Sequence, residues 1–208
     1  GYIGSRLLRL MDESGKVSRI IGVDLNPPRV SAAKMDFHRM DVRDPSLINL
    51  FTLGEVQAVV HLAYVFDPLH DADLEYDIDV GGTRNVLAAS AACVAKHLVI
   101  ASSTTAFGAL PDNPDWLTEN DPPRRQRNFM YASNKYENEL IVRIFKNENP
   151  HVKVAVIRPC IVYGPNVDNF VSHFMIRLPF LPAVGDTATQ MQFVHEDDAA
   201  EVFMRVLE

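Results

Sequence analysis

The sequence predicts an α/β fold built on a doubly wound parallel sheet, and three observations lead to it. Short apolar runs of strand length alternate with longer segments of helical periodicity. A glycine turn, Gly1-Tyr2-Ile3-Gly4, opens the first helical segment. Asp24 ends the next apolar run about 20 positions later. This alternation implies β-α-β crossovers and a Rossmann-like sheet that is covered on both faces.

The first half of the chain is predicted to hold two helices and three strands. A helix over 5–11 follows the glycine turn, because apolar residues recur there at helical spacing. The apolar run 20–24 predicts a buried strand, and 35–41 predicts a shorter one. A helix over 45–53 is followed by another apolar run, 56–62, which predicts a third strand.

The middle of the chain continues the same rhythm. Helical periodicity predicts helices over 74–95 and 129–147, and apolar runs predict strands over 97–103 and 152–158. The stretch 108–128 is rich in Pro, Asp and Asn and has little periodicity. We therefore interpret it as an active-site loop and not as a linker between domains.

Beyond residue 158 the alternation is looser. We expect a turn over 163–166, a short helix over 170–178, a strand over 190–195 and a closing helix over 197–207. These segments are interpreted as the start of a smaller lobe.

The predicted sheet lacks its first strand, because the chain begins at the glycine turn that follows that strand in dinucleotide-binding folds. A sheet without its first strand would expose unpaired backbone groups, so we expect the natural protein to extend before Gly1. Residues 1–160 are expected to form an NAD-binding domain that carries the catalytic residues. Residues 161–208 are expected to form part of a substrate-binding region packed on it.

Composition excludes several classes of protein. The formal net charge is −7 and no dense Lys/Arg run occurs, which disfavours binding to nucleic acid or to an anionic membrane. No apolar run approaches the ~18 residues that a membrane span requires. Cys93 and Cys160 suggest buried thiols in a reducing compartment, and therefore a cytoplasmic protein. The histidines lack metal-ligand spacing, and the acidic series at 71, 73, 75, 77 and 79 is interpreted as helix capping, so no metal site is predicted.

The candidate catalytic residues are Ser103, Tyr131 and Lys135. Tyr131 and Lys135 are four residues apart in a predicted helix and therefore share one face. A phenol titrates near pH ~10, and an adjacent ammonium favours the phenolate. Ser103 ends an apolar strand, which delivers its hydroxyl to the carboxyl edge of the sheet, where α/β enzymes bind their ligands.

The glycine turn predicts a dinucleotide site. Glycines at Gly1 and Gly4 let the backbone approach a pyrophosphate, and the helix N-terminus offers free N–H groups and partial positive charge. Asp24 can accept hydrogen bonds from both adenosine ribose hydroxyls. A carboxylate there would repel a 2′-phosphate, so NAD is predicted rather than NADP.

With these residues in place, the chain resembles the extended short-chain dehydrogenase/reductase family, particularly its NAD-dependent epimerase/dehydratase branch. Further segments that resemble family motifs are Asp41-Val42, His61-Leu62-Ala63, 79–87, 102–108, 158–165 and 193–197. The resemblance implies that Tyr131 is the acid/base, that Lys135 binds the nicotinamide ribose and lowers the Tyr131 pKa, and that Ser103 holds the reacting oxygen. It also implies a homodimer. The expected cofactor contacts are Gly1, Tyr2, Ile3, Gly4, Asp24, Asp41, Val42, Leu62, Ala63, Tyr131, Lys135 and Pro159.

Departures from the family pattern leave several activities open. Thr104 and Thr105 stand where family dehydratases have an acidic pair, which disfavours dehydration. Ile161 replaces an Asn that is frequent in sugar-nucleotide enzymes, and Asp79 replaces the usual Asn. The leading hypothesis is nucleotide-sugar epimerisation. Alternatives are a net ketone or steroid-type reductase and a non-catalytic dinucleotide sensor, although a sensor would not need the tyrosine and the lysine.

Overall fold

The computed structural model describes residues 1–169, 171–173 and 191–207. Its helices are α1 (Tyr2–Glu13), α2 (Leu47–Leu53), α3 (Ala72–Tyr76), α4 (Gly82–Ala92), α5 (Met130–Glu148) and α7 (Glu196–Leu207). Its strands are β1 (Ile20–Asp24), β2 (Met35–Arg39), β3 (Ala58–His61), β4 (His97–Ala101), β5 (Lys153–Ile157), β6 (Ile161–Tyr163) and β7 (Phe193–His195). A π-helical turn (Asp77–Gly81) joins α3 to α4, and a 3-10 turn (Thr104–Phe107) follows β4. Within these described residues, no helix has both the length and the apolar character needed to cross a membrane.

Every strand pair in the described residues is parallel, which confirms the predicted fold class. β3, β4 and β5 form one sheet in that order, with Ala58 opposite His97 and His97 opposite Lys153. β1 pairs with β2, and β6 pairs with β7. In the sequence, α3 and α4 lie between β3 and β4, and α5 lies between β4 and β5, whereas a loop without a helix joins β1 to β2.

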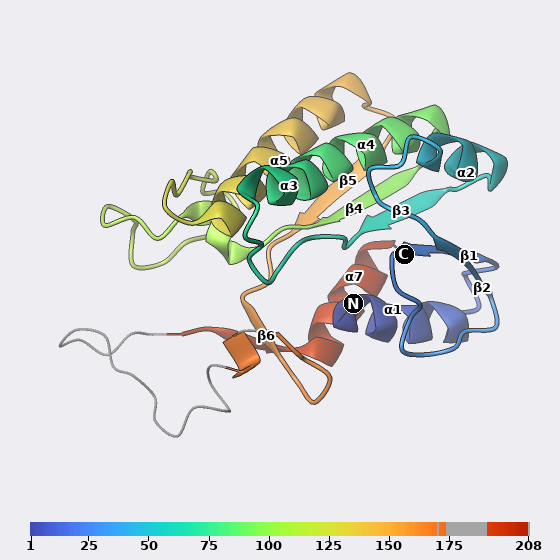
Figure 1. Ribbon diagram of the computed structural model, residues 1–208, viewed down its shortest axis with the longest axis horizontal. Coiled ribbons are helices and arrows are strands. Elements are labelled where there is room, and N and C mark those ends of the chain that lie inside the picture. Colours follow the sequence, from blue (N-terminus) through green and yellow to red (C-terminus); the bar gives the residue numbers. More distant parts are fainter. Residues whose placement is uncertain (170, 174–190, 208) are drawn as a thin grey trace.

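Helices cover both faces of the three-stranded sheet (Figure 1). Successive side chains of a strand point to opposite faces, and β4 illustrates the result. Leu98 and Ile100 pack in a core with residues of α2, α4 and α5, whereas Val99 and Ala101 pack with residues of α1 and α7. Because these four side chains are buried, the segment 98–101 reads in the sequence as a continuous apolar run.

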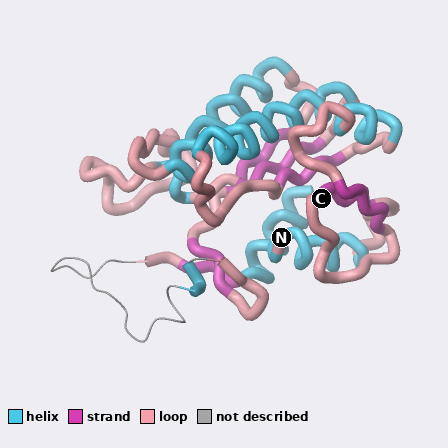
Figure 2. Tube along the Cα trace, viewed as in Figure 1, coloured by secondary structure: helices cyan, strands magenta, loops and turns pink. Residues whose placement is uncertain are grey.

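β1 and β3 are not neighbours in a sheet, and Figure 2 shows the β1–β2 pair apart from β3, β4 and β5. A cavity of about 2150 Å³ is lined by both Ile20–Asp24 and Ala58–His61. No described residue forms a strand between them. The separation occurs at the position where a doubly wound sheet has its first strand, as the sequence predicted.

The predicted elements differ from the structure mainly at their ends. The helix predicted over 74–95 is divided by the π-helical turn and ends at Ala92, because Val94 adopts a φ of 55° while Ala95 N–H bonds to the Ser90 carbonyl. Tyr163, predicted in a turn, instead ends β6. That strand is three residues long and pairs with the distant β7, so no local pattern marks it. The helix predicted over 170–178 lies mostly outside the described residues.

Candidate active site

Ser103 lies directly beyond the carboxyl end of β4. The strand ends at Ala101, and the Ser103 hydroxyl accepts a hydrogen bond from the Thr105 N–H at 3.2 Å, which starts the 3-10 turn. The Thr104 N–H donates to the Pro159 carbonyl after β5 at 3.1 Å. These bonds hold the serine loop at the sheet edge, and the Ser103 side chain is buried beside the cavity.

Tyr131 lies in the first turn of α5 and meets Ser103. The Ser103 side chain interacts with the Tyr131 phenol, and the Phe66 ring packs edge-on against the Tyr131 ring, with centroids 5.3 Å apart. Burial raises the pKa of Tyr131, and the interaction with Ser103 offsets that rise only in part. The predicted lowering of this pKa is therefore wrong for this structure, because loss of hydration outweighs the neighbouring groups.

Lys135 lies one turn further along α5 and is 2% exposed. Its Nζ donates to the Ala101 carbonyl at 2.7 Å and lies 5.4 Å from the centroid of the Tyr131 ring. Burial lowers the pKa of Lys135, while the carboxylates of Asp79 and Glu139 act in the opposite direction. The serine, the tyrosine and the lysine are thus brought together at one end of β4.

Asp79 is fully buried in the π-helical turn, next to this cluster. One carboxylate oxygen accepts the Val65 N–H at 2.8 Å, and the other accepts the Asn134 side-chain amide at 3.0 Å. Burial raises the pKa of Asp79, and these two bonds partly oppose the rise. Asp79, which stands where the family has an asparagine, is therefore bonded to the side-chain amide of Asn134. That residue lies on α5, between Tyr131 and Lys135 in the sequence.

A chain of neutral polar groups continues from Asp79. The Thr83 hydroxyl donates to the Asp79 carbonyl at 2.6 Å, so its oxygen accepts from His61 Nε2 at 2.9 Å. Burial lowers the pKa of His61 to about 3, and the charge of Lys135 adds to this effect. His61 is therefore neutral near pH ~7.

A buried ion pair supports the serine loop from the other side. Arg158 donates to both oxygens of Glu139, at 2.9 and 2.6 Å, and the Ser102 hydroxyl donates to one of them at 2.5 Å. The Arg158 guanidinium also stacks over the Phe107 ring at 4.5 Å. The pair joins the ends of β4 and β5 to α5.

All twelve predicted cofactor contacts line the cavity. Gly1 begins α1 without a side-chain cap, so the first-turn N–H groups of α1 have no competing side-chain acceptor. The Asp24 side chain, at the end of β1, is 46% exposed and accepts the Asn26 N–H at 2.9 Å. Asp41 differs, because both of its carboxylate oxygens are bonded to Arg43. The uncapped helix and the accessible carboxylate fit a dinucleotide.

The polar residues around Lys135 were not found from the sequence. Asn134 and Asn138 are four residues apart and share a helix face, which signals a polar strip on an otherwise core-facing helix. Asn138 donates to the Tyr64 hydroxyl at 2.6 Å, and Tyr64 directly follows the motif residues His61, Leu62 and Ala63. The acidic series at 71–79 includes a helix cap, because Asp71 accepts the N–H groups of Asp73 and Leu74. The described residues contain no group of three or more side chains suited to hold a metal ion.

The parallel sheet, the glycine turn at α1 and the cluster at the end of β4 define a Rossmann-type dinucleotide-binding protein. The chain belongs to the NAD dependent epimerase/dehydratase family, whose sequence profile matches residues 1–208. This confirms the resemblance to extended short-chain dehydrogenases/reductases.

Several curated proteins are similar in sequence. An N-acetyl-alpha-D-glucosaminyl-diphospho-ditrans,octacis-undecaprenol 4-epimerase of Escherichia coli is 31% identical over 170 residues, which are 79% of this chain and 47% of that protein. A UDP-glucose 4-epimerase of Oryza sativa is 29% identical over 177 residues, 76% of this chain and 41% of that protein. An uncharacterised protein of Mycobacterium tuberculosis is 26% identical over 206 residues, 95% of this chain and 54% of that protein. The chain thus spans about half the length of these relatives.

Solved structures share the fold. The UDP-glucose 4-epimerase of Thermus thermophilus in complex with NAD superposes with a TM-score of 0.83 at 23% identity, covering 100% of this chain and 71% of that one. The Thermotoga maritima UDP-glucose 4-epimerase with UDP-glucose gives a TM-score of 0.82 at 23% identity, with the same coverage of 100% and 71%. At this identity the likeness establishes the fold.

Proposed function

We propose that the protein containing this chain catalyses NAD-dependent hydride transfer at a secondary alcohol or ketone, as a nucleotide-sugar epimerase. The single observation that carries the proposal is the cluster of Ser103, Tyr131 and Lys135. The side chains of the first two interact, and the ammonium of the third lies 5.4 Å from the centroid of the Tyr131 ring, on the wall of the cavity. A proton carrier, a hydroxyl that orients oxygen and a cation are the groups that this reaction requires.

The proposed roles follow from the geometry. Ser103 hydrogen-bonds the substrate oxygen, and Tyr131 exchanges the proton of that oxygen. NAD supplies the hydride acceptor and donor. With its raised pKa, the Tyr131 phenol is protonated near pH ~7 and is ready to donate a proton to a ketone. Accepting a proton from an alcohol requires a positive charge beside the phenol, which is the role of Lys135.

The dinucleotide is proposed to lie along the cavity between α1 and the carboxyl ends of the strands. The α1 N-terminus, Gly1 to Gly4, would hold the pyrophosphate, and Asp24 the adenosine ribose. Asp41 and Val42 would flank the adenine. Leu62, Ala63 and Pro159 would lie beside the nicotinamide half together with Tyr131 and Lys135. In this assignment residues 1–160 form the NAD-binding domain and 161–208 form part of the substrate region.

Epimerisation is favoured over dehydration because Thr104 and Thr105 follow Ser103 and carry no carboxylate. Two of the named relatives are 4-epimerases, one of them a UDP-glucose 4-epimerase. An epimerase oxidises the carbinol, lets the ketone turn and reduces its other face, so NAD is regenerated. We also propose a cytoplasmic homodimer that associates through the outer faces of α4 and α5, where Ile144 is exposed.

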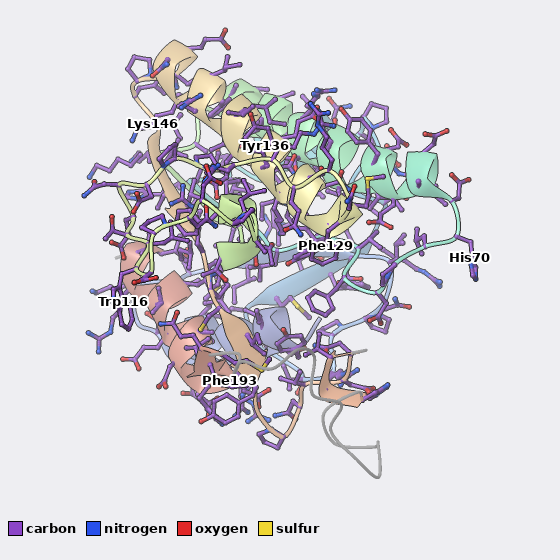
Figure 3. All side chains as sticks on the ribbon, turned by 90° about the vertical axis from the view of Figure 1, so that its left-hand side faces the viewer. His70, Trp116, Phe129, Tyr136, Lys146 and Phe193 are labelled. Atoms are coloured by element: carbon purple, nitrogen blue, oxygen red, sulfur yellow. The ribbon has the colours of Figure 1, made fainter. Side chains whose placement is uncertain are left out.

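Replacement of Tyr131 by Phe tests the proposal. Tyr131→Phe keeps the ring and removes the proton carrier, so turnover is expected to fall about 100-fold or more. Tyr136→Phe, on the same helix (Figure 3), is the matched control and is expected to keep full activity. Unchanged turnover in Tyr131→Phe would exclude this chemistry. A stoichiometric change in NADH absorbance during turnover would identify a net reductase in place of an epimerase.

A further inference from the structure

Tyr64 makes the closest aromatic contact with the candidate catalytic lysine. It lies in the loop after β3, and the centroid of its ring is 2.9 Å from Lys135 Nζ. The corresponding distance to the Tyr131 ring is 5.4 Å. An ammonium over the face of an aromatic ring is attracted to the negative face of the ring, and the attraction is strongest where water is excluded. Lys135 is in such a place, since it is almost completely buried.

The Tyr64 ring is held in this position at its hydroxyl end. Because the Thr83 proton is used at the Asp79 carbonyl, the Tyr64 hydroxyl donates to Thr83 Oγ1, at 3.2 Å. The same hydroxyl accepts from the Asn138 amide at 2.6 Å. Two hydrogen bonds from two different helices therefore fix the plane of the ring.

The contact also defines which way the ammonium points. An ammonium has three N–H donors. One is used at the Ala101 carbonyl, and the Tyr64 ring face receives a second. The third is left for the cavity, which Lys135 lines together with Tyr131.

We propose that Tyr64 is a positioning residue for Lys135, whose ring face stabilises the charged ammonium and directs its remaining N–H toward the cavity. The inference rests on the proposed function, because it gives Lys135 the role of the cation beside Tyr131. It adds a residue that the motif His61-Leu62-Ala63 does not include.

Other groups around Lys135 influence its charge. Asp79 from the π-helical turn and Glu139 from α5 favour the ammonium, whereas burial disfavours it. His61 from β3 is neutral, and Tyr131 from α5 completes the surroundings. All of these groups are unchanged in variants of Tyr64, so a difference between two such variants reports on the aromatic ring.

Two variants separate the ring from its hydroxyl. Tyr64→Phe keeps the ring and loses the bonds to Thr83 and Asn138, whereas Tyr64→Leu removes the ring. The titration of Lys135 Nζ is followed by lysine side-chain NMR, with the signal assigned by its loss in Lys135→Met. The midpoint in Tyr64→Leu is expected about one pH unit below that in Tyr64→Phe, as a desolvated cation–π contact implies. Equal midpoints would overturn the proposal.

If Tyr64→Leu does not fold, Tyr64→Met replaces the ring with an unbranched side chain of similar length and is judged by the same criterion. The pH profile of kcat/KM adds a functional measurement. The limb of this profile that follows formation of the Tyr131 phenolate is expected to move to higher pH in Tyr64→Leu. The reason is that a less charged Lys135 stabilises the phenolate less. If this limb does not move in Tyr64→Leu while Tyr131→Phe is inactive, the role of Tyr64 is rejected and the proposed function stands. A fully active Tyr131→Phe would reject the proposed function, while the NMR midpoints still decide whether Tyr64 stabilises the ammonium.

Discussion

The two walls of the cavity are built in different ways. Behind the wall that carries Ser103, Tyr131 and Lys135, buried polar side chains bond to one another, as Asp79 does to Asn134 and Glu139 does to Arg158. On the wall formed by α1 and β1, the main features are an uncapped helix N-terminus and the accessible carboxylate of Asp24. The first wall is thus supported from behind by a network of protein groups, whereas the second presents polar groups to the cavity.

This difference indicates where the molecule is preorganised. Fixing side chains before a ligand arrives reduces the entropy that binding and catalysis cost. The wall with the Ser103, Tyr131 and Lys135 cluster is prepared in this way by bonds within the chain. The wall around α1 is expected to gain its partners from the dinucleotide. Substitutions on the first wall should therefore change stability, and those on the second should change binding.

The largest effect is expected at the buried ion pair. Glu139→Ala removes the acceptor of both Arg158 and Ser102 and leaves a largely buried guanidinium without its charge partner. Breaking such a pair is expected to lower the free energy of unfolding by about 3 kcal/mol. Urea unfolding measures the loss.

The exposed pair on α7 provides the matched control. Glu201 accepts from Arg205 one turn away, and both side chains are more than half exposed, at 53% and 74%. Glu201→Ala is expected to change stability by no more than ~0.5 kcal/mol. Similar losses in the two variants would mean that the network near the cluster does not contribute more than an ordinary surface pair.

An intermediate effect is expected from the buried histidine. Burial lowers the pKa of His61 from 6.5 to about 3, so the folded protein resists protonation of this ring. The unfolded chain takes up the proton as the pH falls below 6.5. The stabilisation by neutral His61 is thus complete above that pH and is lost as the pH falls toward about 3.

Comparison with His61→Gln isolates this contribution. Glutamine keeps a donor for Thr83 and does not titrate, while all other acidic and basic groups remain. Between about pH 7 and about pH 5, the native chain should lose about 2 kcal/mol more unfolding free energy than the variant. Urea unfolding at both pH values checks this. Parallel losses would show that the ring is not held neutral by the fold.

The parallel sheet could be predicted because local sequence patterns mark its strands. Strands buried on both faces read as apolar runs, so β3, β4 and β5 were found to within a few residues. β6 could not be found, because three residues carry no periodicity and its partner lies far along the chain. The end of α4 was also not predicted. Val94 adopts a left-handed backbone conformation there, and nothing in the sequence indicates this for a β-branched residue.

The same distinction between local patterns and long-range pairing applies to the candidate site. The proximity of Tyr131 and Lys135 could be predicted because four residues make about one helical turn, and the position of Ser103 because a strand ends just before it. The bond between Asp79 and Asn134 joins residues 55 positions apart, and sequence patterns do not indicate which buried polar groups will pair. The direction of the Tyr131 pKa was wrong for a related reason. Burial depends on the whole fold, and it outweighs the local neighbours that the sequence reveals.

The smallest effect is expected on the wall around α1, and it concerns binding. Asp24→Asn keeps the size of the side chain and removes its charge. Charge-assisted bonds to ribose hydroxyls are lost, but the site is half exposed, so NAD affinity is expected to fall only about tenfold. NADP affinity should fall less or rise, because the repulsion of a 2′-phosphate is also removed. Calorimetric titration with both dinucleotides measures the two changes.

Asp36→Asn on the neighbouring strand β2 is the matched control for this substitution. Its carboxylate is as exposed as that of Asp24, is paired with Arg19 and is not part of the cavity lining. Dinucleotide affinity is therefore expected to be unchanged in Asp36→Asn. Equal loss of NAD binding in both variants would point to a general effect of surface charge. Loss confined to Asp24→Asn, with unchanged unfolding free energy, would place the ligand on the wall formed by α1 and β1. The substitution would then remove a contact with the ligand and leave the stability of the protein unchanged.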